Sequence, residues 1–251
     1  MGTAPWLVIH AAILAAWAAA LLLGESSEMR QMALIYGAEV WAGMCGLTQD
    51  LTGYLRLVMM WAVMAAAMML PAVRPSLAVF DDLATAGAQG RGAVLDLTAG
   101  YLLAWLGFAV LAAGAQTGLV AAGLVTPLGQ SLTPHVNAGL MALAGVYQLT
   151  PAKSACLDRC RDPLVVFAEN WAPGRLTALW LGVRLGLWGI GCCWALMLLG
   201  LVGGMMSLLW MGAVTLFIIL ERMAADDRGL PLATGLVLLG AAAMQLGTAV
   251  L

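Results

Sequence analysis

Charged side chains are scarce in this sequence. Asp, Glu, Lys and Arg make up 10% of the 251 residues, whereas hydrophobic residues make up 63% and the mean hydropathy is +0.95. Soluble domains need a charged outer shell and average roughly 25% charged residues. The shortage of charge therefore excludes a soluble globular domain and predicts that lipid is the solvent of this protein.

The long apolar segments also lack an alternation of apolar and polar residues. In a bilayer every backbone polar group has to be satisfied within the protein, which leaves helices or a closed barrel. Barrel strands alternate apolar and polar residues over about ten positions. The segments here are continuous runs rich in Ala, Leu, Met and Gly. The sequence therefore predicts an all-α bundle of transmembrane helices.

Seven segments approach the length of about 20 mostly apolar residues that a membrane-spanning helix needs. We expect them to form a single transmembrane domain over residues 1–251. The second span is expected to end near Pro71 and Pro75, and the polar segment between the fourth and fifth spans is expected to be a loop. The predicted spans are residues 5–23, 55–73, 94–115, 136–149, 176–202, 205–220 and 232–251.

Lysine occurs once, and no basic patch or lysine-rich arm is present, so no nucleic-acid partner is expected. Cytoplasmic loops of membrane proteins carry an excess of positive charge. Eight basic residues in the even-numbered loops stand against two in the odd-numbered loops. This predicts a multi-pass inner-membrane protein with a cytoplasmic N-terminus and a periplasmic C-terminus. The eight are Arg74, Arg91, Lys153, Arg159, Arg161, Arg175, Arg222 and Arg228.

Catalytic signatures are missing as well. The sequence has two histidines, His10 and His135, and neither has a second histidine or a carboxylate at ligand spacing. No catalytic triad, phosphate-binding loop, dinucleotide-binding glycine pattern or zinc signature occurs. We therefore expect a non-enzymatic protein.

Sulfur-containing side chains are what the sequence offers instead. Cys192 and Cys193 are adjacent in a predicted helix. Neighbouring helix residues point about 100° apart, so the two thiols are not expected to hold one ion together. One of them could bind a soft metal ion, since thiolate and thioether ligands favour Cu(I). Alternatively, cysteine here is a small apolar residue that fills a close helix contact beside glycines.

Methionines repeat along the second predicted span. Met60, Met64 and Met68 are four residues apart and share one helix face. Such a stack of thioethers could coordinate or pass Cu(I), and Met205 at the start of the sixth span adds another thioether. The alternative is that they are flexible packing residues, since the chain has 16 methionines.

A further cysteine pair lies in the fourth predicted loop. Cys156 and Cys160 have the spacing that places both thiols on one helix face. A structural zinc site takes four ligands, so two thiols do not form one. They are either a half-site that a partner completes or inert thiols.

Arg184 is the charge placed deepest in a predicted span. It lies nine residues after Arg175, and thus about 13 Å further along the helix. Charges at such depth usually face the bundle interior or an aqueous cavity. Arg184 is therefore expected to contact an anion in a site or to form a structural ion pair with Asp96 or Glu221.

Several of these motifs resemble a bacterial family of membrane proteins, domain-of-unknown-function family 2182, which carries the label of a predicted metal-binding integral membrane protein. The resemblance covers residues 59–222 and implies that the chain handles a metal. It also marks departures: Leu185, Trp188 and Gly189 stand where the family tends to have His, Tyr and Cys, and Ser207 where Asn is common. The motifs include Met64-Ala-Ala-Ala-Met68-Met69-Leu70-Pro71, Tyr147-Gln148-Leu149-Thr150-Pro151, Cys156-x-x-x-Cys160-Arg161, Gly191-Cys192-Cys193-Trp194 and Leu220-Glu221.

Three hypotheses follow. The first is a membrane protein that binds or handles a soft metal such as copper through Met64, Met68, Cys192, Cys193 and Met205, with Arg184, Glu221 and Asp96 as neighbouring or structural charges. The second is an accessory subunit of a larger membrane complex, because the chain has no soluble domain and has helix faces of small residues. The third, a transporter of ions or small solutes, is the weakest, because the spans hold few charges. The bilayer and a membrane-protein partner or oligomer are the expected contacts.

Overall fold

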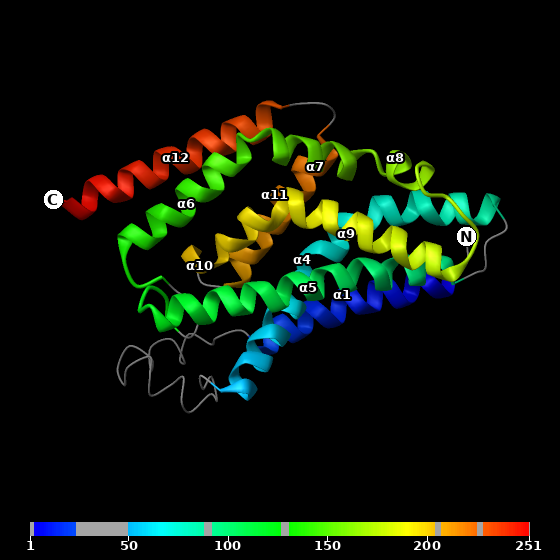
Figure 1. The fold of residues 1–251 in the computed structure, drawn as a ribbon, viewed down its shortest axis with the longest axis horizontal. Helices are drawn as coiled ribbons and strands as arrows, with labels where there is room; N and C mark the ends of the chain where they lie inside the picture. Colours follow the sequence, from blue (N-terminus) through cyan, green and yellow to red (C-terminus); the bar gives the residue numbers. More distant parts are fainter. Residues whose placement is uncertain are drawn as a thin grey trace.

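The structure is a computed structural model that describes residues 3–23, 50–87, 92–126, 131–203, 207–224 and 228–250. Every regular element in these ranges is a helix, apart from an isolated bridge between Val125 and Ser131. The predicted all-α class is therefore confirmed. Figure 1 shows an elongated bundle whose termini lie at opposite ends of its long axis.

Each of the seven predicted spans contains a helix. Four helical stretches are long and apolar enough to cross a membrane: Leu51–Ala86, Ala93–Ala121, Arg175–Gly203 and Gly229–Thr248. The apolar part of the first helix, and the fourth and sixth predicted spans, are shorter. The number of crossings stays a prediction. The helices are α1 (Thr3–Leu23), α4 (Leu51–Ala86), α5 (Ala93–Ala121), α6 (Pro134–Gln148), α7 (Pro151–Arg161), α8 (Pro163–Ala168), α9 (Arg175–Leu198), α10 (Gly200–Gly203), α11 (Leu208–Met223) and α12 (Gly229–Val250).

Helix α4 differs from the second predicted span because it continues through both prolines to Ala86. A proline removes one helix hydrogen bond, a loss that contacts with neighbouring helices can offset inside a membrane. Such contacts occur beside both prolines: the Tyr101 hydroxyl donates to the carbonyl of Met69 at 3.4 Å, and the Arg222 guanidinium donates to that of Ala72, also at 3.4 Å. The prediction that this helix ends near Pro71 and Pro75 is wrong.

Glycines let α5 and α9 come into backbone contact. A Cβ added at Gly182 would lie 2.0 Å from the carbonyl oxygen of Leu97, and one added at Gly100 would lie 1.9 Å from that of Leu179. A Cβ at Gly186 would also meet α5, at 2.6 Å. Small residues four apart commonly permit such close approach in membranes. This contact forms the centre of the bundle and fixes the position of α9.

Helices α6 and α7 follow one another with a break at Leu149 and Thr150. Thr150 caps α7 by accepting a hydrogen bond from the Lys153 amide, and Pro151 occupies the first turn, where no amide donor is needed. In Figure 1, α6 lies beside α12, and α7 lies above the middle of α9, with which it is in contact. The break therefore redirects the chain from α12 toward the bundle centre.

The prediction that residues 150–174 form a loop is wrong for α7. This helix packs against α9 near Cys192, which lies about 25 Å along α9 from its start at Arg175. Two of the eight basic residues counted for sidedness, Lys153 and Arg222, thus lie within the bundle, fully and partly buried. Hydropathy misses this placement because it does not register that buried charges can pair. The orientation in the membrane stays a prediction.

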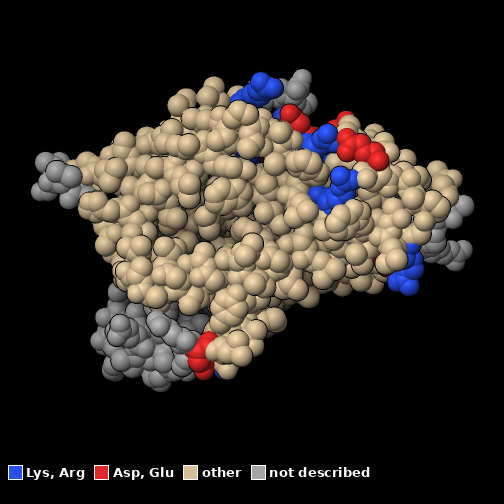
Figure 2. Space-filling model, viewed as in Figure 1, with Lys and Arg blue, Asp and Glu red and all other residues tan. Residues whose placement is uncertain are grey.

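Charged side chains cover little of the face shown in Figure 2. Most of the Lys, Arg, Asp and Glu atoms on this face gather along the edge formed by α7, α8 and the start of α12, and the few others lie apart at two other edges. Large apolar side chains stand exposed on the outer helices, among them Leu111, Leu209 and Met244. Such a surface suits contact with lipid.

The α5–α9 contact gives the first testable prediction. Gly182→Ala should destabilise the protein by about 1–3 kcal/mol, because the added methyl group overlaps the backbone of α5. Gly107→Ala is the control, since no atom lies within 4 Å of a Cβ there. Thermal unfolding in detergent measures both variants. Equal midpoints would contradict the described contact.

Candidate metal centre

The candidate site lies where α7 packs against α9 and α11. The site contains an ion pair between the Lys153 ammonium and the Glu221 carboxylate at 2.7 Å, with 0% and 1% of the two side chains exposed. The Lys153 ammonium also donates to the backbone carbonyl of Cys192. The Gln148 amide donates to the second Glu221 oxygen at 3.1 Å. One lysine thus joins α7 to both α9 and α11.

Two arginines add positive charge beside this ion pair. Arg161 donates through Nε and Nη2 to the Glu221 carbonyl at 3.1 and 2.8 Å. Arg222 points its Nη2 at the sulfurs of Cys192 and Cys193, at 3.5 and 3.7 Å, and its buried Nε has no hydrogen-bond partner among the described residues. Glu221 is the one acidic side chain that these contacts include. The site therefore carries more positive than negative charge when its thiols are protonated.

Three thiols meet in front of Arg222. The sulfurs of Cys192 and Cys193 are 3.0 Å apart, and that of Cys160 is 3.6 Å from that of Cys192. All three cysteines are buried. The sulfurs of Cys192 and Cys193 come together although neighbouring helix positions point about 100° apart, because side-chain rotation can bring them to the same side. The expectation that these two thiols do not hold one ion together stays a prediction.

The fourth described cysteine occupies a neighbouring place. The Cys156 sulfur lies beside Gly191, where an added Cβ would stand 2.5 Å from it. Tyr147 donates to the Gly191 carbonyl and packs edge-on against Trp194, with ring centroids 4.9 Å apart. The segments from Tyr147 to Pro151 and from Gly191 to Trp194 are therefore in direct contact, and they meet at the site.

The protonation state of Cys160 decides whether it can bind a metal ion directly or has to lose a proton first. Its hydrogen bond with Cys192 and its burial raise the pKa of the Cys160 thiol well above the ordinary value. Burial also raises the pKa of the Cys156 thiol. Both residues of α7 are thus thiols at neutral pH, and a metal that bound to Cys160 would displace its proton.

The sulfur positions permit a test of fit to a metal ion. With metal–sulfur bonds of about 2.3 Å, three ligands in a plane lie about 4 Å from one another. The sulfurs of Cys160 and Cys192 are within a few tenths of an ångström of that separation, and Cys193 would have to rotate away. Among the described residues, no group of three or more His, Cys, Asp or Glu side chains already has the arrangement of a metal site. The thiols are therefore close enough to share an ion only after a small adjustment.

The predicted methionine ligands lie on α4, a helix that contributes no thiol to the group. Met64 and Met68 are buried in α4, on the same helix face as Ala72 and two turns and one turn before it. Because the Ala72 carbonyl binds Arg222, this face leads toward the thiols. Among the described residues, no hydrogen bond joins either thioether to a thiol. Met205 lies outside the described residues.

The predicted partners of Arg184 are engaged elsewhere. Asp96 forms a two-bonded ion pair with Arg175, with both N–O distances at 3.0 Å, and Glu221 binds Lys153. Arg184 is half-buried on α9, and no ion pair of it occurs among the described residues. The structural pair expected between Arg184 and Asp96 or Glu221 is therefore not formed in the described part of the chain.

In a comparison with known protein families, residues 58–245 match the family described as "PpoB2: Copper chaperone". The chain belongs to this family. The match covers about three quarters of the chain and includes residues 59–222, which carry the resemblance to a metal-binding membrane family; it does not give the number of that family. No curated protein and no solved structure matches the chain. All residues of the candidate site lie within the range that matches the copper-chaperone family.

The buried ion pair gives the second prediction. Lys153→Met should destabilise the fold by about 3–5 kcal/mol, because it leaves the Glu221 carboxylate buried without a counter-charge. The double variant Lys153→Met/Glu221→Gln should recover part of this loss, since it buries no charge at the pair. Unfolding midpoints in detergent, compared as a double-mutant cycle, measure the coupling. Additive effects would contradict a direct pair.

Proposed function

We propose that this protein binds Cu(I) within the membrane and transfers it to a partner protein. Membership of the copper-chaperone family supports the cargo, and the buried group of Cys160, Cys192 and Cys193 beside Arg222 supports the place. The contact of the Arg222 guanidinium with two sulfurs is the observation that carries the proposal. A cation without a carboxylate partner favours anionic ligands next to it.

Charge balance favours a cuprous thiolate. Two thiolates and one Cu(I) ion carry a net charge of −1, which the Arg222 guanidinium offsets. Thiolates are soft ligands that select Cu(I), and a structural zinc site takes four ligands in a closed tetrahedron. A site of two or three thiols that can loosen by side-chain rotation suits a cargo that has to leave again.

The methionines of α4 are proposed as the path of copper to the thiols. Met64 and Met68 succeed each other by one turn, or about 6 Å, on the face that reaches Arg222 through Ala72. Thioethers are neutral soft ligands, so they hold Cu(I) less firmly than thiolates do. Met205 remains a proposed ligand from the sequence pattern alone.

The setting follows from the lipid-facing helices. We infer a multi-pass protein of the inner membrane, with its N-terminus in the cytoplasm and its C-terminus in the periplasm, from the charge distribution of the sequence. The opposite positions of the two termini in Figure 1 are compatible with this. The receiving partner would contact the protein at the membrane, because the described chain consists of helices with short connections.

The thiols give the third prediction. Purified protein loaded anaerobically with Cu(I) should bind the ion, and Cys192→Ser should lower its affinity by at least about tenfold, because one thiolate ligand is lost. Cys160→Ser and Cys193→Ser should each weaken binding as well. Cys156→Ser is the matched control and should retain binding, since the hydrogen bonds between thiols of the described residues join Cys160, Cys192 and Cys193 and leave out Cys156. Competition with a chromogenic Cu(I) chelator measures all four variants, and unchanged affinity in Cys192→Ser would overturn the site.

The methionine path gives the fourth prediction. Met68→Leu keeps the volume and removes the thioether, so it should slow Cu(I) uptake by the protein more than it lowers the final copper content. Met59→Leu on the same helix is the control, because 63% of Met59 is exposed, against 2% of Met68. Stopped-flow transfer from a Cu(I) chelator measures the rates. Equal rates for both variants would contradict the path.

A further inference from the structure

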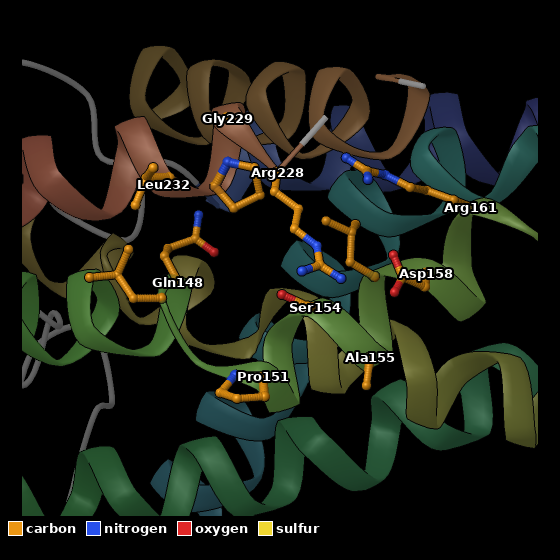
Figure 3. Close-up of a pocket in the computed structure, with 12 residues that line it drawn as sticks. Gln148, Pro151, Ser154, Ala155, Asp158, Arg161, Arg228, Gly229 and Leu232 are labelled. Atoms are coloured by element: carbon orange, nitrogen blue, oxygen red, sulfur yellow. The ribbon is translucent and has the colours of Figure 1, made fainter. Parts of the chain in front are cut away.

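A polar cavity lies beside the Lys153–Glu221 ion pair, since Gln148 both lines the cavity and donates to the Glu221 carboxylate. The cavity has a volume of about 690 Å³ and opens between the end of α6, α7 and the start of α12. Figure 3 shows its lining, with polar side chains from all three segments directed into one space. The copper proposal assigns no task to this cavity.

Positive charge dominates the lining. Arg161 comes from the end of α7 and Arg228 from the residue before α12, while Asp158 is the single acidic side chain among the lining residues. Figure 3 shows the Arg228 guanidinium pointing into the cavity toward Ser154. The Arg228 side chain forms no hydrogen bond or ion pair with the described residues, and its backbone carbonyl accepts from the Leu232 amide at 3.2 Å. Guanidinium groups match the geometry of phosphate oxygens.

Gln148 supplies an acceptor that lacks a partner. This side chain is 3% exposed and lines the cavity, and its Oε1 has no hydrogen-bond partner among the described residues. The orientation of the amide is fixed, because its Nε2 donates to the Glu221 carboxylate. A buried acceptor without a donor is energetically unfavourable. The cavity therefore suits a ligand that brings an N–H or O–H donor to Gln148.

The lining also includes an apolar part, which is buried at Leu157 and reaches the outer surface of the bundle at Leu149 and Leu232. Leu149, Leu157, Leu232 and Pro231 form this part. Leu149 and Leu232 are 42% and 52% exposed, so the cavity opens onto the apolar surface of α6 and α12. A ligand with a charged head and an apolar body can occupy such a cavity directly from the bilayer.

We propose that this cavity binds a membrane phospholipid whose headgroup carries an N–H or O–H donor. The phosphodiester would lie against Arg228 and Arg161, and the ammonium or hydroxyl group of the headgroup would donate to Gln148 Oε1 and Asp158. Phosphatidylethanolamine and phosphatidylglycerol have such donors, whereas the trimethylammonium group of phosphatidylcholine has none. The site is independent of copper, although Gln148 connects it to the ion pair that positions the thiols.

Lipid selectivity tests this proposal. The full chain, purified in detergent, is mixed with phosphatidylethanolamine, phosphatidylglycerol or phosphatidylcholine of identical acyl chains, and native mass spectrometry measures bound lipid. The two donor-bearing lipids should bind at least about tenfold more tightly than phosphatidylcholine, because only they satisfy Gln148. Equal binding of all three would overturn the proposal. So would saturable binding of inorganic phosphate without any selective lipid binding.

Two arginine variants test whether the selective lipid binding takes place in this cavity. Arg228→Gln should weaken binding of the donor-bearing lipids by at least about tenfold, since a charge-assisted hydrogen bond to phosphate is lost. Arg228 is exposed and outside the helices, so this variant should fold normally. Arg159→Gln is the matched control, because Arg159 is on the same helix as Arg161 but pairs with Glu169 away from the cavity. Equal effects of the two substitutions would indicate attraction by overall charge and would overturn the assigned site.

Discussion

The buried ion pair between Lys153 and Glu221 holds a polar helix against the centre of an apolar bundle. A charge near the middle of a membrane costs about 2.5–3.5 kcal/mol or more when it has no partner. Here the ammonium has a carboxylate and a backbone carbonyl as acceptors, and the carboxylate also accepts from Gln148. Because Lys153 contacts α9 and α11 at once, it sets where α7 lies, and Cys160 reaches Cys192 for that reason.

The thiols and the ion pair thus form one structural unit. Arg222 follows Glu221 on α11, so the residue that neutralises Lys153 and the residue that faces the thiols move together. Tyr147 links the break before α7 to Gly191. A change in the position of α7 would separate Cys160 from Cys192 without breaking any covalent bond, which is a suitable mechanism for releasing a bound ion to a partner.

The sequence was sufficient for the fold class and for placing a helix in each of the seven predicted spans. Continuous apolar runs identify helices in lipid without tertiary information. The continuation of α4 beyond Pro71 was not predictable, because it depends on Tyr101 and Arg222, which are distant in sequence. The same holds for α7: a polar segment reads as a loop unless the partner of its lysine is known.

The site was predictable in part. Cys192 and Cys193 were recognised as candidate ligands from their types, and Cys156 and Cys160 were left as either a half-site or inert thiols. What spacing within one helix cannot reveal is that the Cys160 sulfur of α7 lies 3.6 Å from the Cys192 sulfur of α9 in the same chain. Arg222 was counted as a loop charge, since charge patterns along the sequence do not distinguish an exposed arginine from one that faces sulfur.

The most direct test of this account is cross-linking between α7 and α9. In a Cys156→Ser/Cys193→Ser background, mild oxidation in native membranes should join Cys160 to Cys192 as a disulfide, detected as a linked peptide by mass spectrometry, because their sulfurs are 3.6 Å apart. Ready labelling of Cys160 by a membrane-impermeant maleimide, with no linked peptide, would place α7 in an exposed loop and contradict the account.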